Sequence, residues 1–174
     1  MVQVEELDRI SSAIGDIERF FGDMGRMGIC EEVSQEDLKG FYAASMVLLA
    51  VINRTIDLAN ELILLYGWEE PFSYAEAFRV IERQEVIDKD LCGRLVVLVR
   101  LRNFPSHEYH RATKRDIRRA CELIGSVQEF VAAVEDWIKK VWRSMMSREP
   151  EIVATLERKP WIVLLPDGRF AVLY

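Results

Sequence analysis

The chain has 174 residues, of which 50% are hydrophobic and 30% are charged, with only 9 glycines and 5 prolines. This length can bury one substantial core but is short for two enzymatic domains, and the composition excludes a disordered chain and favours a helical globular protein. The net charge of −6 argues against a nucleic-acid-binding protein whose surface is basic throughout.

Two long helices are predicted in the first part of the chain. Residues 2–27 place apolar side chains three and four positions apart, which is the pattern of an amphipathic helix. Ser34 and Asp37 resemble a capping box, and residues 38–66 then form a long, apolar-rich run without proline. We expect this run to be the central helix of the fold.

Two shorter helices should follow. Ser73 begins a second capping box and predicts a helix that ends near residue 84. Asp88 can cap a further helix, in which apolar residues recur on neighbouring turns as far as Arg102. Pro105 should stop that helix, because proline lacks a backbone N–H and clashes with the preceding turn.

The last part of the chain changes character. Thr113 and Asp116 form a third capping box, which predicts one unbroken helix to about residue 146. Long helices joined by short breaks predict an all-α, up-and-down bundle of four to five helices over residues 1–146. In the extension, residues 147–174, two apolar stretches flank a Pro-Asp-Gly turn and predict a β-hairpin, which should dock on the bundle, a second subunit or a partner.

The cysteines, the first residues and the longest apolar run indicate the cellular compartment of the protein. Cys30, Cys92 and Cys121 are odd in number and lack paired spacing, so we expect three reduced, mostly buried thiols. The first nine residues are acidic where a secretory signal would be basic. The longest apolar run, residues 43–52, is far shorter than the roughly 20 residues that span a bilayer. These features predict a cytoplasmic protein that does not associate with a membrane.

Positive charge is concentrated in one segment. Residues 94–119 contain eight basic and two acidic side chains, a local charge of +6. This asymmetry predicts a basic face on an acidic body, where an RNA phosphate backbone would dock. Compensating salt bridges around a solvated helix start are the alternative interpretation. The candidate RNA-binding residues are Arg100, Arg111, Lys114 and Arg115.

A short motif inside this segment carries the chemistry. Arg102 offers a planar, permanently charged fork that suits a phosphate, and His107 can give and take protons near neutral pH. RNA cleavage by its own 2′-hydroxyl needs proton transfer at the nucleophile and at the leaving oxygen. Asn103 can tie down the helix end, and Tyr109 can point its hydroxyl to the same side.

The same residues also have a purely structural interpretation. Arg102 can interact with the negative end of its helix, Asn103 can cap it, and His107 and Tyr109 can pack the turn. No acidic residue or cysteine stands at ligand spacing to either histidine, so no metal site is predicted, and no cofactor is expected.

The spacing from Arg102 to His107 and Tyr109 resembles the signature of the HEPN superfamily, in particular the HepT-like toxins of prokaryotic toxin–antitoxin pairs. Weaker similarity extends to residues 56–60 and 71–78, and the resemblance covers roughly residues 1–145. One departure is the sequence Phe-Pro-Ser at residues 104–106, where the family usually has aliphatic residues, because the proline restricts the turn that carries His107.

The resemblance implies an all-α homodimer in which two copies of the motif face one cleft. It implies a metal-independent endoribonuclease, with Arg102 and His107 catalytic. It also implies a partner, because HepT-like toxins are paired with small nucleotidyltransferase antitoxins that transfer AMP from ATP onto the motif tyrosine, here Tyr109. Bulky anionic groups beside a phosphate-binding arginine would repel RNA.

Two other functions stay open at the level of sequence. The chain can be a non-catalytic HEPN module that binds a nucleotidyltransferase or a nucleotide, which the atypical residues 104–106 and the negative net charge favour. It can also be a helical dimerisation protein without a site. The latter would hold Arg102 and His107 apart, with no cleft shared between subunits.

Overall fold

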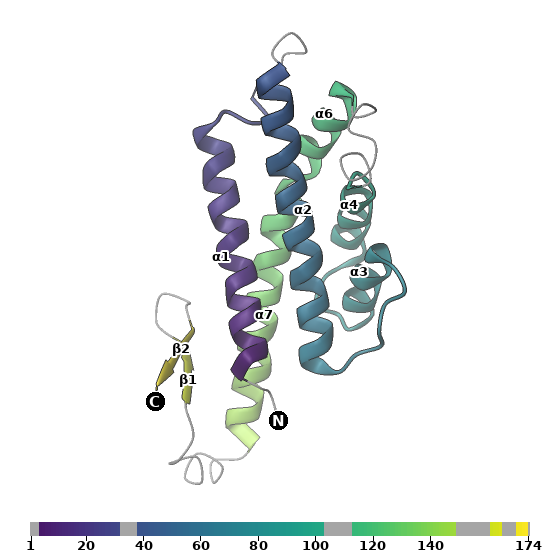
Figure 1. The fold of residues 1–174 in the computed structure, drawn as a ribbon. Helices are drawn as coiled ribbons and strands as arrows, with labels where there is room; N and C mark the ends of the chain where they lie inside the picture. Colours follow the sequence, from purple (N-terminus) through teal and green to yellow (C-terminus); the bar gives the residue numbers. More distant parts are fainter. Residues whose placement is uncertain (1–3, 32–37, 103–112, 149–160, 165–169, 174) are drawn as a thin grey trace.

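A computed structural model of the chain describes residues 4–31, 38–102, 113–148, 161–164 and 170–173. Helix α1 spans Val4–Arg26, and helix α2 spans Leu38–Tyr66. They run side by side in opposite directions (Figure 1), as the apolar periodicity of both segments predicts. Both long helices are therefore confirmed, whereas the expected capping box before α2 lies outside the described residues.

Two shorter helices, α3 (Tyr74–Arg83) and α4 (Lys89–Arg100), pack on each other and on α2. The Ser73 side chain accepts a hydrogen bond from the backbone N–H of Glu76 (3.1 Å), and Asp88 accepts one from that of Leu91 (2.8 Å). Each cap satisfies an N–H group that the first helical turn would otherwise leave unpaired. Both predicted helix starts are confirmed.

The helix predicted over residues 113–146 is divided, so the prediction of one unbroken element is wrong. Helix α6 (Lys114–Leu123) ends just before Ile124, and helix α7 (Gly125–Arg148) begins just after it. Gly125 weakens the helix locally, and the Ser126 hydroxyl donates to the Leu123 carbonyl (2.6 Å), which competes with the backbone ladder. The capping box that starts α6 is confirmed, with Thr113 and Asp116 bonded in both directions.

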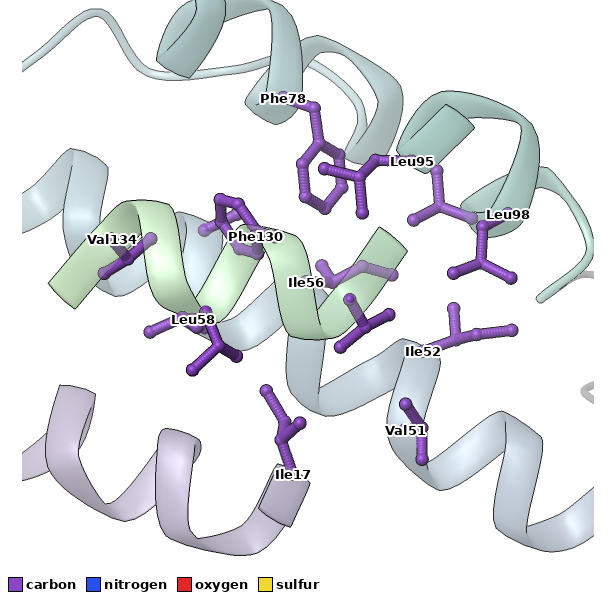
Figure 2. Close-up of a cluster of buried hydrophobic side chains, with 14 of the residues drawn as sticks. Ile17, Val51, Ile52, Ile56, Leu58, Phe78, Leu95, Leu98, Phe130 and Val134 are labelled. Atoms are coloured by element: carbon purple, nitrogen blue, oxygen red, sulfur yellow. The ribbon is translucent and has the colours of Figure 1, made fainter. Parts of the chain in front are cut away.

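One hydrophobic core joins α1, α2, α3, α4, α6 and α7. Figure 2 shows side chains from α2, α3, α4 and α7 converging at its centre. Phe78 of α3 and Phe130 of α7 are fully buried and meet edge to face, with ring centroids 5.4 Å apart. Leu95 and Leu98 of α4 belong to the same buried cluster as the apolar face of α2. This core fixes the position of α4, whose C-terminal end carries Arg102.

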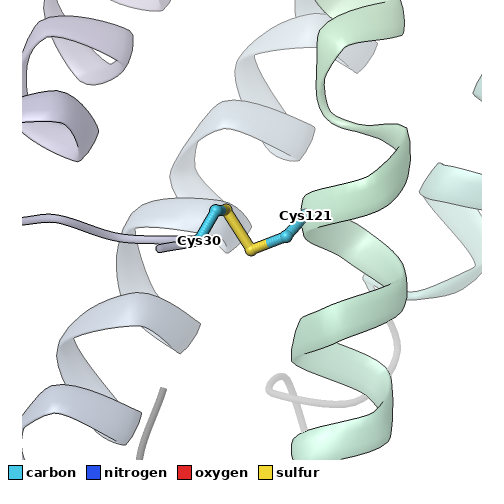
Figure 3. Close-up of a disulfide and its surroundings, with 2 residues drawn as sticks. All are labelled: Cys30 and Cys121. Atoms are coloured by element: carbon cyan, nitrogen blue, oxygen red, sulfur yellow. A yellow bond between two sulfur atoms is a disulfide. The ribbon is translucent and has the colours of Figure 1, made fainter. Parts of the chain in front are cut away.

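The cysteine prediction is wrong for two of the three residues. Cys30 and Cys121 form a disulfide between the turn after α1 and helix α6 (Figure 3), with Cα atoms 5.3 Å apart and a sequence separation of 91 residues. Packing of distant segments brings these residues together, and their spacing in the sequence carries no sign of it. Cys92 is a free thiol and is buried, as expected, and burial raises its pKa.

Two short strands follow α7 in the chain. Strand β1 (Trp161–Leu164) pairs antiparallel with β2 (Phe170–Leu173), so that Trp161 lies opposite Leu173 and Leu164 opposite Phe170. The Pro-Asp-Gly turn expected between them lies outside the described residues. None of the described helices combines the length and apolarity needed to cross a membrane.

Candidate functional site

Arg102 directly follows helix α4 and is partly buried. The helix ends at Arg100, two residues earlier than predicted, and Leu101 is its C-terminal cap in a right-handed helical conformation. The backbone N–H of Arg102 donates to the carbonyl of Val99 (3.2 Å), so the chain continues the last turn as far as this residue. Its side chain is thereby held at the end of a helix that the core anchors.

The Arg102 guanidinium has two described partners, and neither carries a charge. Its Nε donates to Oδ1 of Asn53 in the middle of α2 (2.5 Å). Its Cζ lies 4.6 Å from the ring centroid of Tyr74, the first residue of α3. An arginine has five N–H donors, of which four are on the Nη atoms. No described residue accepts a hydrogen bond from those four donors. The charge of Arg102 is therefore not balanced by a described partner, and its Nη donors are available to a ligand.

Contacts of neighbouring residues anchor the chain at Asn53 and at Tyr74. Next to Asn53, the Arg54 side chain binds α1, donating from Nε to Asp16 (2.9 Å) and from Nη2 to Ser12 (3.2 Å). Tyr74 follows Ser73, whose side chain caps α3. The site therefore gathers residues from α2, α3 and the end of α4, three elements of one core.

Sequence reasoning missed both partners of Arg102. Asn53 follows the apolar run of residues 43–52 and begins a polar stretch with Arg54 and Thr55, so nothing in the sequence sets it apart from its polar neighbours. Tyr74 falls in the segment 71–78, whose similarity to the family is weak. The Asn53–Arg102 contact spans 49 residues, so no local pattern indicates it.

A second arginine of α4, Arg94, is bound quite differently. Its Nη1 and Nη2 donate to both carboxylate oxygens of Glu129 on α7 (2.6 and 2.7 Å), and its Nε donates to Asp90 (3.0 Å). The hydrogen bonds between this pair raise the pKa of Arg94 and lower the pKa of Glu129. Arg94 therefore contributes no net charge to the predicted basic face.

Three of the predicted RNA-binding residues are described. Arg100 and Arg115 are exposed, Lys114 is partly exposed, and none forms an ion pair with another described residue. Lys114 and Arg115 occupy the first turn of α6, where the positive end of the helix dipole disfavours cations. Their charges therefore do not serve the stability of α6.

The other predicted site residues, Asn103, His107, Tyr109 and Arg111, lie outside the described residues. In the sequence they lie between Arg102 and Thr113, which is the N-cap of α6. Among the side chains that the structure describes, no group of three or more His, Cys, Asp or Glu residues gathers as a metal site would require.

A family model described as Ribonuclease HepT-like matches residues 10–134. No curated protein matches the chain. Similar solved folds include the Bacillus subtilis cytosolic protein of unknown function YutE, which is 16% identical; the match covers 72% of this chain and 90% of that one, with a TM-score of 0.61.

Two further similar folds come from toxin–antitoxin complexes. One is a toxin–antitoxin structure with AMP-PNP (17% identity, TM-score 0.55), and the other is a tri-AMPylated Shewanella oneidensis HEPN toxin in complex with MNT antitoxin (18% identity, TM-score 0.54). Each match covers 76% of this chain and 96% of the other. At these identities the likeness establishes the fold alone.

Proposed function

This chain belongs to the Ribonuclease HepT-like family, and on that premise we propose that it is the metal-independent endoribonuclease toxin of a toxin–antitoxin pair. One observation carries the proposal. The arginine at the motif position, Arg102, is ordered by two uncharged partners and keeps four N–H donors that no described residue occupies.

In the proposed reaction, the RNA 2′-hydroxyl attacks the adjacent phosphorus and the bond from phosphorus to the 5′-oxygen breaks. His107 takes the 2′-hydroxyl proton as a base and, as an acid, gives a proton to the departing 5′-oxygen, which leaves a 2′,3′-cyclic phosphate and a 5′-hydroxyl. Arg102 neutralises the extra negative charge that develops on the phosphoryl oxygens. Asn103 supports the turn between the two catalytic residues.

RNA would approach along Arg100, Arg111, Lys114 and Arg115. The three described members of this set lie at the end of α4 and the start of α6, on the two sides of the chain segment that carries the motif. Arg100, Lys114 and Arg115 form no ion pair with another described residue, and on a protein with a net charge of −6 their charges would favour phosphate binding at this place.

The toxin is proposed to act as a homodimer. The α2 face that includes Asn53 also exposes Tyr42, Met46 and Leu64, whose side chains are 50%, 53% and 56% accessible. Their spacing along the helix puts them on one stripe with Asn53. Apolar side chains on one exposed stripe favour burial against another surface, here a second copy of the chain. Light scattering should then give a dimer, and Met46→Glu should shift it toward monomer.

The proposed partner is a nucleotidyltransferase antitoxin that AMPylates Tyr109. The tyrosine oxygen would attack the α-phosphorus of ATP, lose its proton and release pyrophosphate. Toxin–antitoxin folds with AMP-PNP and with a tri-AMPylated toxin, similar to this one, support this choice. Incubation with the partner and ATP should add mass to Tyr109 in multiples of AMP, whereas Tyr109→Phe should gain none.

A ribonuclease assay on the purified protein with a chelator present tests the proposal. The wild type should cleave RNA, and His107→Ala should be inactive while its oligomeric state is unchanged. Undiminished cleavage by pure His107→Ala would contradict the mechanism. RNA or nucleotidyltransferase binding without any cleavage by the wild type would instead identify a non-catalytic module.

A further inference from the structure

We propose that Asn53 and Tyr74 are positioning residues, which orient the Arg102 guanidinium so that its Nη1–Nη2 edge faces the scissile phosphate. The inference rests on the proposed function and adds residues that the family motif does not contain. It follows from the two contacts of Arg102, a hydrogen bond from its Nε and a cation–π contact of its guanidinium with an aromatic ring.

Asn53 fixes one end of the guanidinium. A free arginine side chain loses rotamer entropy when it binds a ligand. The hydrogen bond from Nε to Oδ1 of Asn53 (2.5 Å) restricts the side chain before substrate arrives. Because an amide is neutral, it does so without cancelling the charge that the phosphate must meet. Asn53 thus restricts the Arg102 side chain and leaves its charge available to a phosphate.

Tyr74 restricts the guanidinium from a second side. The Cζ atom of Arg102 lies over the Tyr74 ring, 4.6 Å from its centroid, so an anion cannot reach the guanidinium from the side of the ring. The Nη donors, whose fork matches two phosphate oxygens, are the donors that neither partner uses. The ring itself provides the cation–π contact, so the phenolic hydroxyl is dispensable for it.

Neither residue is a principal support of the fold. Tyr74 is 45% exposed and absent from the buried core, and Asn53 is only partly buried. Both touch the Arg102 side chain at its functional end. A positioning role therefore predicts a loss of activity that far exceeds any loss of stability, whereas a structural role predicts the reverse.

The test measures kcat and KM for RNA cleavage by the full-length protein, with melting temperature measured in parallel. Asn53→Ala and Tyr74→Ala should each lower kcat/KM by about tenfold to 100-fold, since small misplacements of catalytic groups have effects of this size. Tyr74→Phe should restore most of the loss, because it keeps the ring. Gln128→Ala, which removes an exposed amide on α7, is the matched control and should match the wild type.

A double-mutant cycle separates positioning from a general effect. In an Arg102→Ala background, Asn53→Ala and Tyr74→Ala should cost almost nothing further, because they act only through the arginine. Additive losses would overturn the proposal. Binding is measured with a fluorescent single-stranded RNA and with its all-2′-deoxy counterpart. The deoxy oligonucleotide lacks the attacking hydroxyl, so its binding reports the phosphate contact without cleavage.

These measurements test the positioning role and the ribonuclease activity separately. If the wild type cleaves RNA and Asn53→Ala cleaves equally well, the positioning role is wrong and the proposed ribonuclease stands. If the wild type binds both oligonucleotides without cleaving, and Arg102→Ala and Asn53→Ala both weaken binding, positioning is upheld and the ribonuclease is rejected. If the wild type neither binds nor cleaves RNA, both are rejected.

Discussion

Two arginines along helix α4 have opposite kinds of partner. In the middle of the helix, Arg94 binds the carboxylates of Glu129 and Asp90, which occupy its fork and balance its charge. Just past its end, Arg102 meets an amide and an aromatic ring, which hold the side chain without balancing it. Both arginines belong to the segment with a local charge of +6.

The partners of a charged side chain therefore decide whether it can bind a ligand, and its presence in the sequence alone does not. The bidentate ion pair of Arg94 joins two helices, and its carboxylate already occupies the fork of donors that a phosphate would need. An arginine with neutral partners is restrained but still attracts an anion. The first arrangement ties α4 to α7, and the second makes Arg102 a candidate phosphate-binding group.

The largest expected effect concerns the core that carries α4. Leu98 is fully buried one turn before Arg102, so Leu98→Ala should lower the free energy of unfolding by about 2–5 kcal/mol. Its neighbour Val97 is 36% exposed, and Val97→Ala should cost well under half as much. Denaturant titration of both variants measures this. Equal losses would contradict the claim that the buried core fixes the helix.

The second prediction concerns Asn53→Asp, which would give Arg102 a charged partner, as Arg94 already has. Asn53→Asp supplies a carboxylate of the same shape, which should pair with Arg102 and neutralise it. Cleavage should fall by about tenfold or more, equivalent to about 1.4 kcal/mol in the barrier. Gln128→Glu adds the same charge at an exposed position on α7 and is the control. Unchanged cleavage by Asn53→Asp in a kinetic assay would show that the charge of Arg102 is irrelevant.

The third prediction concerns the basic residues around the site. Arg115→Ala should weaken RNA binding a few-fold and lower the salt slope by about 0.7, the value for one contact to a single strand. Arg19→Ala removes the same charge from α1, where the arginine pairs with Asp16. Titrations at several salt concentrations should give a smaller change for Arg19→Ala. Equal changes would indicate that only net charge matters.

The smallest effect is the pH dependence of the Arg94–Glu129 pair. Its hydrogen bonds hold the pKa of Glu129 below its ordinary value of 4.5. A depressed folded-state pKa adds stability above pH 4.5, and this is lost as pH falls from there through the folded pKa. Glu129→Gln should therefore melt slightly below the wild type at neutral pH, and the gap should close in acid. A gap that widens in acid would reverse the assignment.

The helices could be predicted because their signals are local. Apolar spacing indicates α1 and α2, and side chains at Ser73, Asp88 and Thr113 mark three helix starts that the structure contains. The break at Ile124 was missed because a single glycine is often tolerated in a helix, and the competing bond from Ser126 becomes evident only in the structure.

The site could be predicted only in part, because its geometry depends on long-range contacts. The motif identified Arg102, but Asn53 lies 49 residues away in sequence and Glu129 is 35 residues from Arg94. The same holds for Cys30 and Cys121, which are 91 residues apart. Counting charges along the sequence could not distinguish an arginine already paired from one left available.

The most direct test compares Arg102→Ala with Arg94→Ala in a cleavage assay on purified, folded protein. Both variants remove one guanidinium from the same helix region. We expect Arg102→Ala to lose about 10²–10³-fold in kcat, the usual effect of removing a group that stabilises transition-state charge, and Arg94→Ala to stay within a few-fold of the wild type. Equal losses in the two variants, or full activity in Arg102→Ala, would contradict the account.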